Sequence, residues 1–189
     1  MHVTISAIPS STINRGANTK IEIEEHNPNW AEMFKIEREL ILKNSQDYIE
    51  DIQHVGSTAV PGLAAKPTID ICIGVKSLEI ADKYIISSLK LMGYDYLQFL
   101  EEGIPQRRYL QKLDDTCKHL FHIHIVVKDG VLWNEYINFR DYLIKNPHIA
   151  REYEEHKLKL KELYSSNRNL YTEGKAEFIN NIISKIGKN

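Results

Sequence analysis

Residues 68–75 constrain the fold more than any other segment, because isoleucine and valine alternate there with Asp70, Cys72 and Gly74. Side chains alternate between the two faces of a strand, so one face of this segment is apolar and must pack in a core. The other face carries Asp70, and an unpaired buried carboxylate is costly. We interpret Asp70 as a ligand of a metal or phosphate site, with a capped loop anchor as the alternative.

Two histidines share one face of a second predicted strand, residues 120–127. His122 and His124 are two residues apart, so their imidazoles point the same way. Such a pair can chelate a metal or bind an anion, and it can equally be a hydrogen-bonded structural pair. If this strand lies beside residues 68–75, then Asp70, Cys72, His122 and His124 form one polar patch.

The loop that follows the predicted strand 49–55 contains Gly56, Ser57 and Thr58. Gly56 lets a phosphate approach the backbone closely, and the free N–H groups and hydroxyls that follow it suit an anion. Pro61 can begin a short helical turn, which adds a weakly positive terminus. A Gly-Ser-Thr sequence alone is common in loops, but followed by Asp70 on a buried strand it is specific.

Strands precede helices along the chain without a regular βαβ alternation, which predicts an α+β fold with a mixed sheet. Residues 1–19 lack a core-facing pattern and are predicted to be a loose arm, so that residues 20–187 form the domain. Strands are predicted at 20–24, 49–55, 68–75, 94–97, 107–111 and 120–127. Helices are predicted from Trp30 to Ile41, at 77–92, and near 132–145, 149–165 and 173–186.

Composition excludes several classes of protein. The chain of 189 residues is 42% hydrophobic and carries a formal net charge of -2, so nonspecific nucleic-acid binding is not predicted. Two cysteines, Cys72 and Cys117, are too few for a disulfide scaffold. With neither a signal-peptide pattern nor a bilayer-length apolar run, the chain is expected in the cytoplasm without a membrane partner. The sequence leaves the oligomeric state open.

Basic residues supply further candidates for binding an anion. Arg140 lies on an apolar helical stripe, where a guanidinium must be paired. It is either an ion-pair partner of Asp70, or of an acidic residue in another element, or a phosphate clamp. Lys66, Arg107 and Arg108 are also anion-binding candidates, although each is more typical of solvated surface charge. Tyr171 and Lys175 can close over the site, but residues 172–175 are more simply a helix start.

Several ordered motifs resemble the GrpB family, which is placed in the nucleotidyltransferase superfamily. The main one is residues 54–71, HVGSTAVPGLAAKPTIDI. The resemblance covers about residues 20–187 and continues in Trp30, Gly93-Tyr94, His122-Ile123-His124, residues 139–143 and residues 171–175. It implies a nucleotidyltransferase-like α+β core followed by a C-terminal helical segment.

The resemblance also implies a mechanism with which this chain agrees only in part. In the superfamily a Gly-Ser loop holds nucleotide phosphates, two carboxylates spaced two residues apart hold magnesium ions, and a third carboxylate assists the attacking group. Gly56, Ser57 and Asp70 match this pattern. Cys72 stands at the second carboxylate, and His122 and His124 occupy the strand expected for the third. Thiols and imidazoles favour ions softer than Mg²⁺.

The leading hypothesis is a protein that binds a nucleotide or another phosphorylated small molecule, and that, if active, transfers a nucleotidyl group. Asp70, His122 and His124 are the candidate catalytic and metal-binding residues, with Mg²⁺ or Mn²⁺ as the expected ion and a softer metal as an alternative. The candidate ligand-binding residues are His54, Gly56, Ser57, Thr58, Lys66 and Arg140. The competing hypotheses are a noncatalytic binding module and a metal-dependent enzyme of different chemistry.

Overall fold

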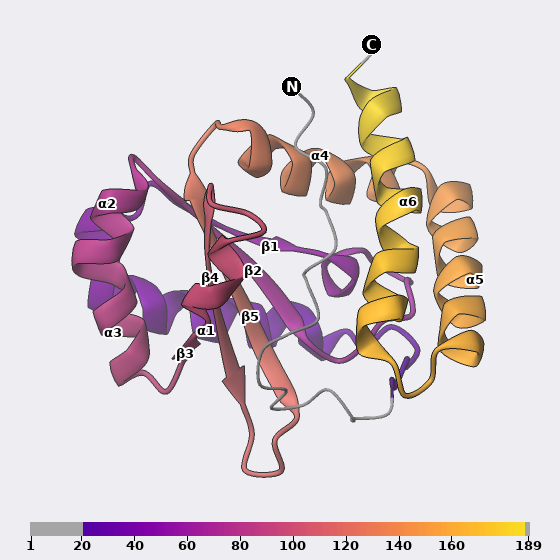
Figure 1. The fold of residues 1–189 in the computed structure, drawn as a ribbon, viewed down its shortest axis with the longest axis horizontal. Coiled ribbons are helices and arrows are strands. Elements are labelled where there is room, and N and C mark those ends of the chain that lie inside the picture. The colour runs from indigo at the N-terminus through magenta and orange to yellow at the C-terminus, as the bar shows by residue number, and fades with distance from the viewer. Residues whose placement is uncertain (1–20, 188–189) are drawn as a thin grey trace.

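A mixed five-stranded sheet organises residues 21–187, which are the residues that this computed structural model describes (Figure 1). The strands are β1 (Asp51–Val55), β2 (Ile69–Val75), β3 (Asp95–Tyr96), β4 (Arg107–Leu113) and β5 (His119–Val127). Their spatial order is β1-β2-β5-β4-β3, with β2 and β5 parallel and all other neighbours antiparallel. The α+β fold with a mixed sheet is therefore confirmed. The predicted arm, residues 1–19, lies outside the described residues.

Helices cover both faces of the sheet and extend beyond its β1 edge (Figure 1). The long helices are α1 (Asn29–Ser45), α4 (Val131–Lys145), α5 (Pro147–Leu163) and α6 (Arg168–Ile186). The predicted helix at 77–92 consists of α2 (Leu78–Ile80), the π-helical segment η3 (Ala81–Ile85) and α3 (Ile86–Leu91). Short 3-10 turns are η1 (Gln46–Tyr48), η2 (Ser57–Ala59) and η4 (Gln98–Glu101). Within residues 21–187 no helix combines the length and apolarity needed to cross a membrane.

The apolar side of β2 forms the centre of the main core. Ile69, Ile71 and Ile73 are fully buried and pack with residues of α1 and α3, including Ile41 and Leu89. We call this side of the sheet the α1 face. Its composition follows from the alternation of side chains along the strand, as the sequence predicted.

The opposite side of β2 lies against α4, and we call it the α4 face. Cys72 is fully buried there in a cluster with Trp133. A Cβ atom added at Gly74 would come within 2.8 Å of the Trp133 ring, so glycine is what lets the indole lie against the strand. Asp70 lies two residues before Cys72 and therefore projects from the same face. His122 and His124 project there as well, because they lie opposite Asp70 and Cys72 where β2 pairs with β5.

One predicted strand and one predicted helix start are wrong. Residues 21–24 form no regular strand, and only an isolated bridge joins Glu24 to Ala65. Helix α6 begins at Arg168, so residues 172–175 lie inside it and do not start it. Asn167 starts the helix, because its side-chain oxygen accepts a hydrogen bond from the Leu170 N–H at 3.2 Å.

Helix α5 fixes the loop that leads into β2. The Ala64 N–H donates to the Glu154 carboxylate at 2.7 Å, and the Ala64 carbonyl accepts a hydrogen bond from Lys157. Burial, with a smaller effect from the charge of Lys175, lowers the Lys157 pKa to about 7. The C-terminal helices therefore hold this loop in place beside the sheet.

Candidate functional site

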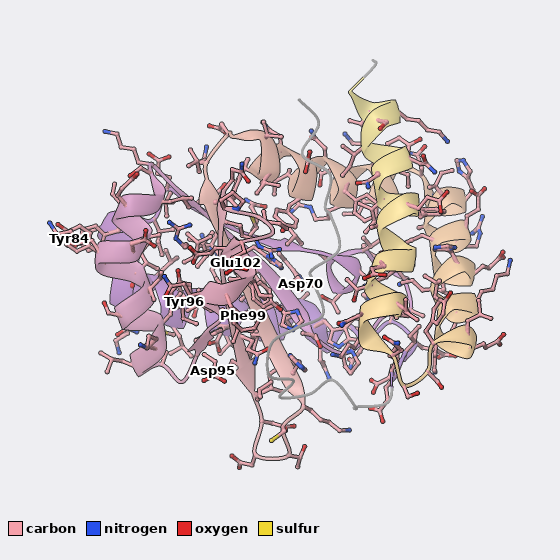
Figure 2. The ribbon with its side chains drawn as sticks, in the orientation of Figure 1. Asp70, Tyr84, Asp95, Tyr96, Phe99 and Glu102 are labelled. Carbon is pink, nitrogen blue, oxygen red and sulfur yellow. The ribbon has the colours of Figure 1, made fainter. Side chains whose placement is uncertain are left out.

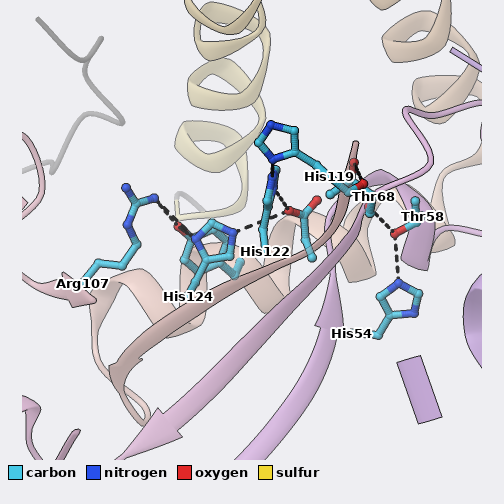
Figure 3. A network of polar contacts seen from close by, with 9 residues as sticks. His54, Thr58, Thr68, Arg107, His119, His122 and His124 are labelled. Carbon is cyan, nitrogen blue, oxygen red and sulfur yellow. Dashed lines mark hydrogen bonds and ion pairs between the residues drawn. The ribbon is translucent and has the colours of Figure 1, made fainter. Parts of the chain in front are cut away.

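The centre of the candidate site is the Asp70 carboxylate, which lies between two imidazoles, those of His122 and His124 labelled in Figure 3. β2 and β5 pair so that Asp70 lies opposite His122 and Cys72 lies opposite His124. Asp70 Oδ1 is 3.1 Å from His122 Nδ1 and 3.6 Å from His124 Nε2. The structure thus brings together three of the four residues that the sequence predicted to form one polar patch. The fourth, Cys72, lies on the same face but is buried in an apolar cluster. Figure 2 shows Asp70 near the middle of the view, far from Tyr84 at its edge.

The polar network continues from His122 to the start of β5. His122 Nε2 lies 3.0 Å from His119 Nδ1, and the Thr68 hydroxyl donates to the His119 carbonyl at 3.1 Å. With His122 Nδ1–H donating to Asp70, the other ring nitrogen either accepts from His119 or, in the cationic ring, donates to it. His119 was not predicted as a site residue.

The network ends on its other side at Arg107, the first residue of β4. Arg107 Nη1 donates to the Tyr136 hydroxyl at 3.3 Å and to His124 Nδ1 at 3.4 Å. The Tyr136 hydroxyl is itself 3.2 Å from His124 Nδ1. Arg107 is only 8% exposed, so its description as solvated surface charge is wrong.

Electrostatics favour a charged Asp70 beside a neutral His124. Burial opposes ionisation of Asp70, but the hydrogen bonds from His122 and His124 outweigh burial and hold the pKa of that carboxyl far below its usual range. The pKa of His124 is lowered by burial and by the charge of Arg107, against the opposing effect of Asp70. A neutral His124 with its proton on Nε2 can donate to Asp70 while Nδ1 accepts from Arg107.

The glycine loop lies directly against this carboxylate. Gly56 has φ +71°, and a Cβ atom at this position would come within 2.4 Å of Asp70 Oδ2. Only glycine fits both this backbone conformation and the contact. The next residue, Ser57, is held by a hydrogen bond with Tyr153 of α5. The loop therefore presents its backbone at the edge of the Asp70 network.

Two predicted ligand-binding residues of this loop have other partners. His54 lies on the α1 face, since it pairs with Ile71 in the sheet, and its ring stacks on Phe34 with 4.9 Å between centroids. The Thr58 hydroxyl is buried, 3.0 Å from His54 Nε2, and it donates to the Thr68 carbonyl at 3.4 Å. Asp70 instead pairs with Val55, so it projects from the opposite face of the sheet to His54. The contacts of His54 and Thr58 are structural and anchor the loop.

The other basic candidates lie at different places. Arg140 Nη1 donates to Gln53 Oε1 and to the His54 carbonyl, each at 2.9 Å, and its Nε pairs with Asp141 of the same helix at 2.7 Å. Its acidic partner is therefore neither Asp70 nor a residue of another element. Lys66 is half-buried in the loop before β2, with its carbonyl accepting the Thr68 N–H at 2.7 Å.

Tyr171 and Lys175, the residues of α6 predicted as able to close over the site, lie next to each other. Tyr171 is 6% exposed, and Lys175 Nζ lies 4.7 Å from the centroid of its ring. Burial raises the Tyr171 pKa to about 12.

The donor set does not fit a pair of magnesium ions. Cys72, at the position of the second carboxylate, is fully buried among apolar side chains, and burial raises the pKa of its thiol. Asp70 and the two histidines form hydrogen bonds with one another, so the nitrogens facing the carboxylate carry protons and do not offer lone pairs. Across the described residues, no three His, Cys, Asp or Glu side chains are arranged to hold a metal ion. These side chains therefore do not fit a two-magnesium site.

Comparison with known proteins identifies the family. The chain matches the family model described as GrpB protein over residues 20–185. The Glutamate-rich protein GrpB of Alkalihalophilus pseudofirmus is 35% identical over 178 residues, which cover 92% of this chain and 98% of that protein. The UPF0157 protein YqkA of Bacillus subtilis is 37% identical over 85% of this chain and 45% of its own length.

Solved structures agree with this result. The crystal structure of the conserved protein GrpB from Enterococcus faecalis superposes with a TM-score of 0.77 at 30% identity, over 88% of this chain and 99% of that one. A structure of the Cid1 poly(U) polymerase with Mg and 3'-dATP bound has a TM-score of 0.51 at 16% identity, over 80% of this chain and 49% of that chain, a likeness in fold alone. The chain thus belongs to the GrpB family and has a nucleotidyltransferase-like fold.

Proposed function

We propose that this protein binds a nucleotide or another phosphorylated small molecule where the Gly56–Ser57 loop meets Asp70. The observation that carries the proposal is the close contact between Gly56 and the Asp70 carboxylate. A glycine with positive φ at this contact leaves the backbone uncovered by a side chain, which lets a phosphate approach the N–H groups that follow. The nucleotidyltransferase-like fold and the 3'-dATP named for Cid1 support the choice of ligand class.

Charge balance supports binding without a bridging metal. An ionised Asp70 would repel a phosphate unless positive charge compensates for it. His122, which bonds to Asp70 through Nδ1, can carry that charge when both of its ring nitrogens are protonated. The proposed ligand contact is therefore made by backbone N–H groups, Ser57 and the imidazoles.

The proposal is for binding, and it favours the noncatalytic module among the hypotheses drawn from the sequence. Nucleotidyl transfer by two magnesium ions needs hard oxygen ligands in octahedral geometry. Asp70 is the one carboxylate that the described residues contribute to this network, and Cys72 is enclosed in the apolar cluster against α4. Asp70, His122 and His124 accordingly act here as a hydrogen-bonded unit that orients the ligand.

The test is calorimetric titration of ATP into the wild type, Gly56→Ala and Gly62→Ala, in buffer with EDTA and in buffer with Mg²⁺. Gly62 also has positive φ, +77°, but a Cβ atom there meets nothing within 4 Å. Both substitutions strain the backbone, and only Gly56→Ala also pushes against Asp70. We expect wild-type binding to survive EDTA, Gly62→Ala to keep it, and Gly56→Ala to weaken it at least about tenfold, a loss of about 1.4 kcal/mol.

Circular dichroism of both variants checks that they fold. Equal ATP affinity in folded Gly56→Ala and Gly62→Ala would contradict the proposed place of binding. A strict requirement for Mg²⁺ would contradict the metal-free contact and return the Asp70 carboxylate to the role of a metal ligand.

A further inference from the structure

Arg107 carries a buried positive charge that no acidic side chain in the described part of the chain neutralises. The residue is 8% exposed, and within that part its Nη1 forms hydrogen bonds with the Tyr136 hydroxyl and with the His124 ring, whose pKa is lowered. Its Nε is buried without a hydrogen-bond partner. Among residues 21–187 no carboxylate forms an ion pair with it.

The neighbouring Arg108 supplies an internal comparison. It projects from the α1 face of the same strand, and its guanidinium binds both oxygens of Asp82, at 2.6 and 2.8 Å. Glu101 adds a third contact at 3.3 Å. The more exposed arginine is thus fully paired, whereas the more buried one lacks an acid. Burying a charge costs desolvation energy. If both arginines were only structural, the more buried one would therefore be expected to have the acidic partner.

A guanidinium cannot escape this cost by losing its proton, because arginine remains charged in proteins. A buried arginine without an acidic partner is therefore stabilised when an anion reaches it. The Nε–H of Arg107 has no acceptor among the described residues, so the guanidinium keeps a donor for an oxyanion. The Nε and Nη2 edge of a guanidinium matches the two oxygens of a carboxylate or phosphate.

We propose that Arg107, with the Tyr136 hydroxyl beside it, is a binding site for an oxyanion, either a carboxylate or a phosphate group. Arg107 stands above the ring of Tyr109, with its Cζ 5.0 Å from the ring centroid, which keeps the guanidinium plane in place. His124 separates this site from Asp70, so the site lies on the same face as the glycine loop but at the other end of the network. It goes beyond the nucleotide site proposed above and does not depend on it.

The experiment measures melting temperature in sodium chloride, phosphate and acetate at equal ionic strength. It compares the wild type with Arg107→Met, Arg107→Lys and the control Arg108→Gln. At ten times its dissociation constant, a specific anion is expected to raise the wild-type melting temperature by about 3–5 °C. Phosphate and acetate distinguish the two oxyanion classes.

Arg107→Met removes the uncompensated charge, so we expect its melting temperature in chloride to equal or exceed that of the wild type, with the anion effect lost. Arg107→Lys keeps the charge without the planar fork, and it is expected to need a higher anion concentration for the same shift. Arg108→Gln keeps the anion effect, because it lies on the other face of the sheet. Gly56→Ala keeps it as well, which separates this site from the loop site.

Three results would overturn the proposal. One is a wild-type melting temperature that neither phosphate nor acetate raises above its value in chloride. Another is an undiminished anion effect in Arg107→Met. The last is a lower melting temperature of Arg107→Met in chloride, because that loss would make Arg107 a structural residue whose network already satisfies it.

Discussion

The two faces of the sheet differ in how their buried charged side chains are paired. On the α1 face, Glu37 is 4% exposed and its Oε1 lies 2.8 Å from the Tyr94 hydroxyl and 3.0 Å from Lys112 Nζ. Each member of this cluster has a partner of suitable chemistry. On the α4 face, Asp70 is shared by two imidazoles, and Arg107 at the end of the same network has no acidic partner among residues 21–187.

This difference separates a cluster that stabilises the fold from one that is suited to binding. A closed buried network has already used its donors and acceptors, so it has little to offer a ligand. The α4 face keeps a glycine backbone, a row of imidazoles and an uncompensated guanidinium close together. Unpaired polar groups cost stability in the free protein, and a ligand that pairs with them recovers that energy.

The largest effect on stability is expected from breaking the closed cluster. Glu37→Ala leaves Lys112 without its acid and Tyr94 without its acceptor. Breaking a buried ion pair typically costs about 3–5 kcal/mol, and because the Lys112 side chain is 25% exposed we expect about 2–3 kcal/mol. Urea denaturation measures the change in the free energy of unfolding, with the exposed Glu39→Ala of the same helix as control. A loss below about 0.5 kcal/mol would refute the assignment of a structural role.

A smaller effect, confined to acidic pH, is expected from His54 on the same face. Burial lowers the His54 pKa from 6.5 to about 4. As pH falls below 6.5, the unfolded chain takes up this proton before the folded protein does, so stability present at pH 7 is lost between pH 6.5 and 4. Asp70 does not contribute to this window, because its pKa is held far below its ordinary value and its stabilisation is lost only at still lower pH.

His54→Gln should therefore flatten the decline of unfolding free energy between pH 7 and pH 4.5 by about 1–2 kcal/mol, after allowance for partial exposure. His124, whose pKa is also lowered, keeps part of the slope. Urea midpoints measured across this range provide the data, and His148→Gln, at an exposed histidine, is the control. Parallel curves for wild type and His54→Gln would show that His54 is not held neutral by the fold.

Strand parity let the sequence predict correctly that three of the candidate residues share one face of the sheet. Alternation along residues 68–75 and 120–127 placed Asp70, His122 and His124 on one face, and the pairing of β2 with β5 joins them. The same rule, applied to residues 49–55, would have separated His54 from the site, because His54 shares the parity of Ile52. The position of His54 in the motif suggested that it binds the ligand, whereas its ring lies on the core side of the sheet.

The remaining site residues depended on contacts between distant elements. Arg107 and Arg108 are adjacent and chemically identical, and only the register of β4 against β5 decides which one is buried beside His124. Tyr136 reaches the network from α4, and Tyr153 reaches Ser57 from α5. Sequence periodicity gives the direction of a side chain within its own element. It does not give the element that packs against it.

Chemical-shift mapping by NMR tests the contrast between the two faces most directly. ATP is titrated into ¹⁵N-labelled protein, and the backbone amides of residues 56–58, 70 and 119–124 are compared with those of Glu37, Tyr94 and Lys112. We predict saturable shifts at the first group of amides, around the Asp70 network, and unchanged shifts in the closed cluster on the α1 face. Shifts centred on Glu37, Tyr94 and Lys112, with residues 56–58 and 70 unaffected, would contradict this prediction.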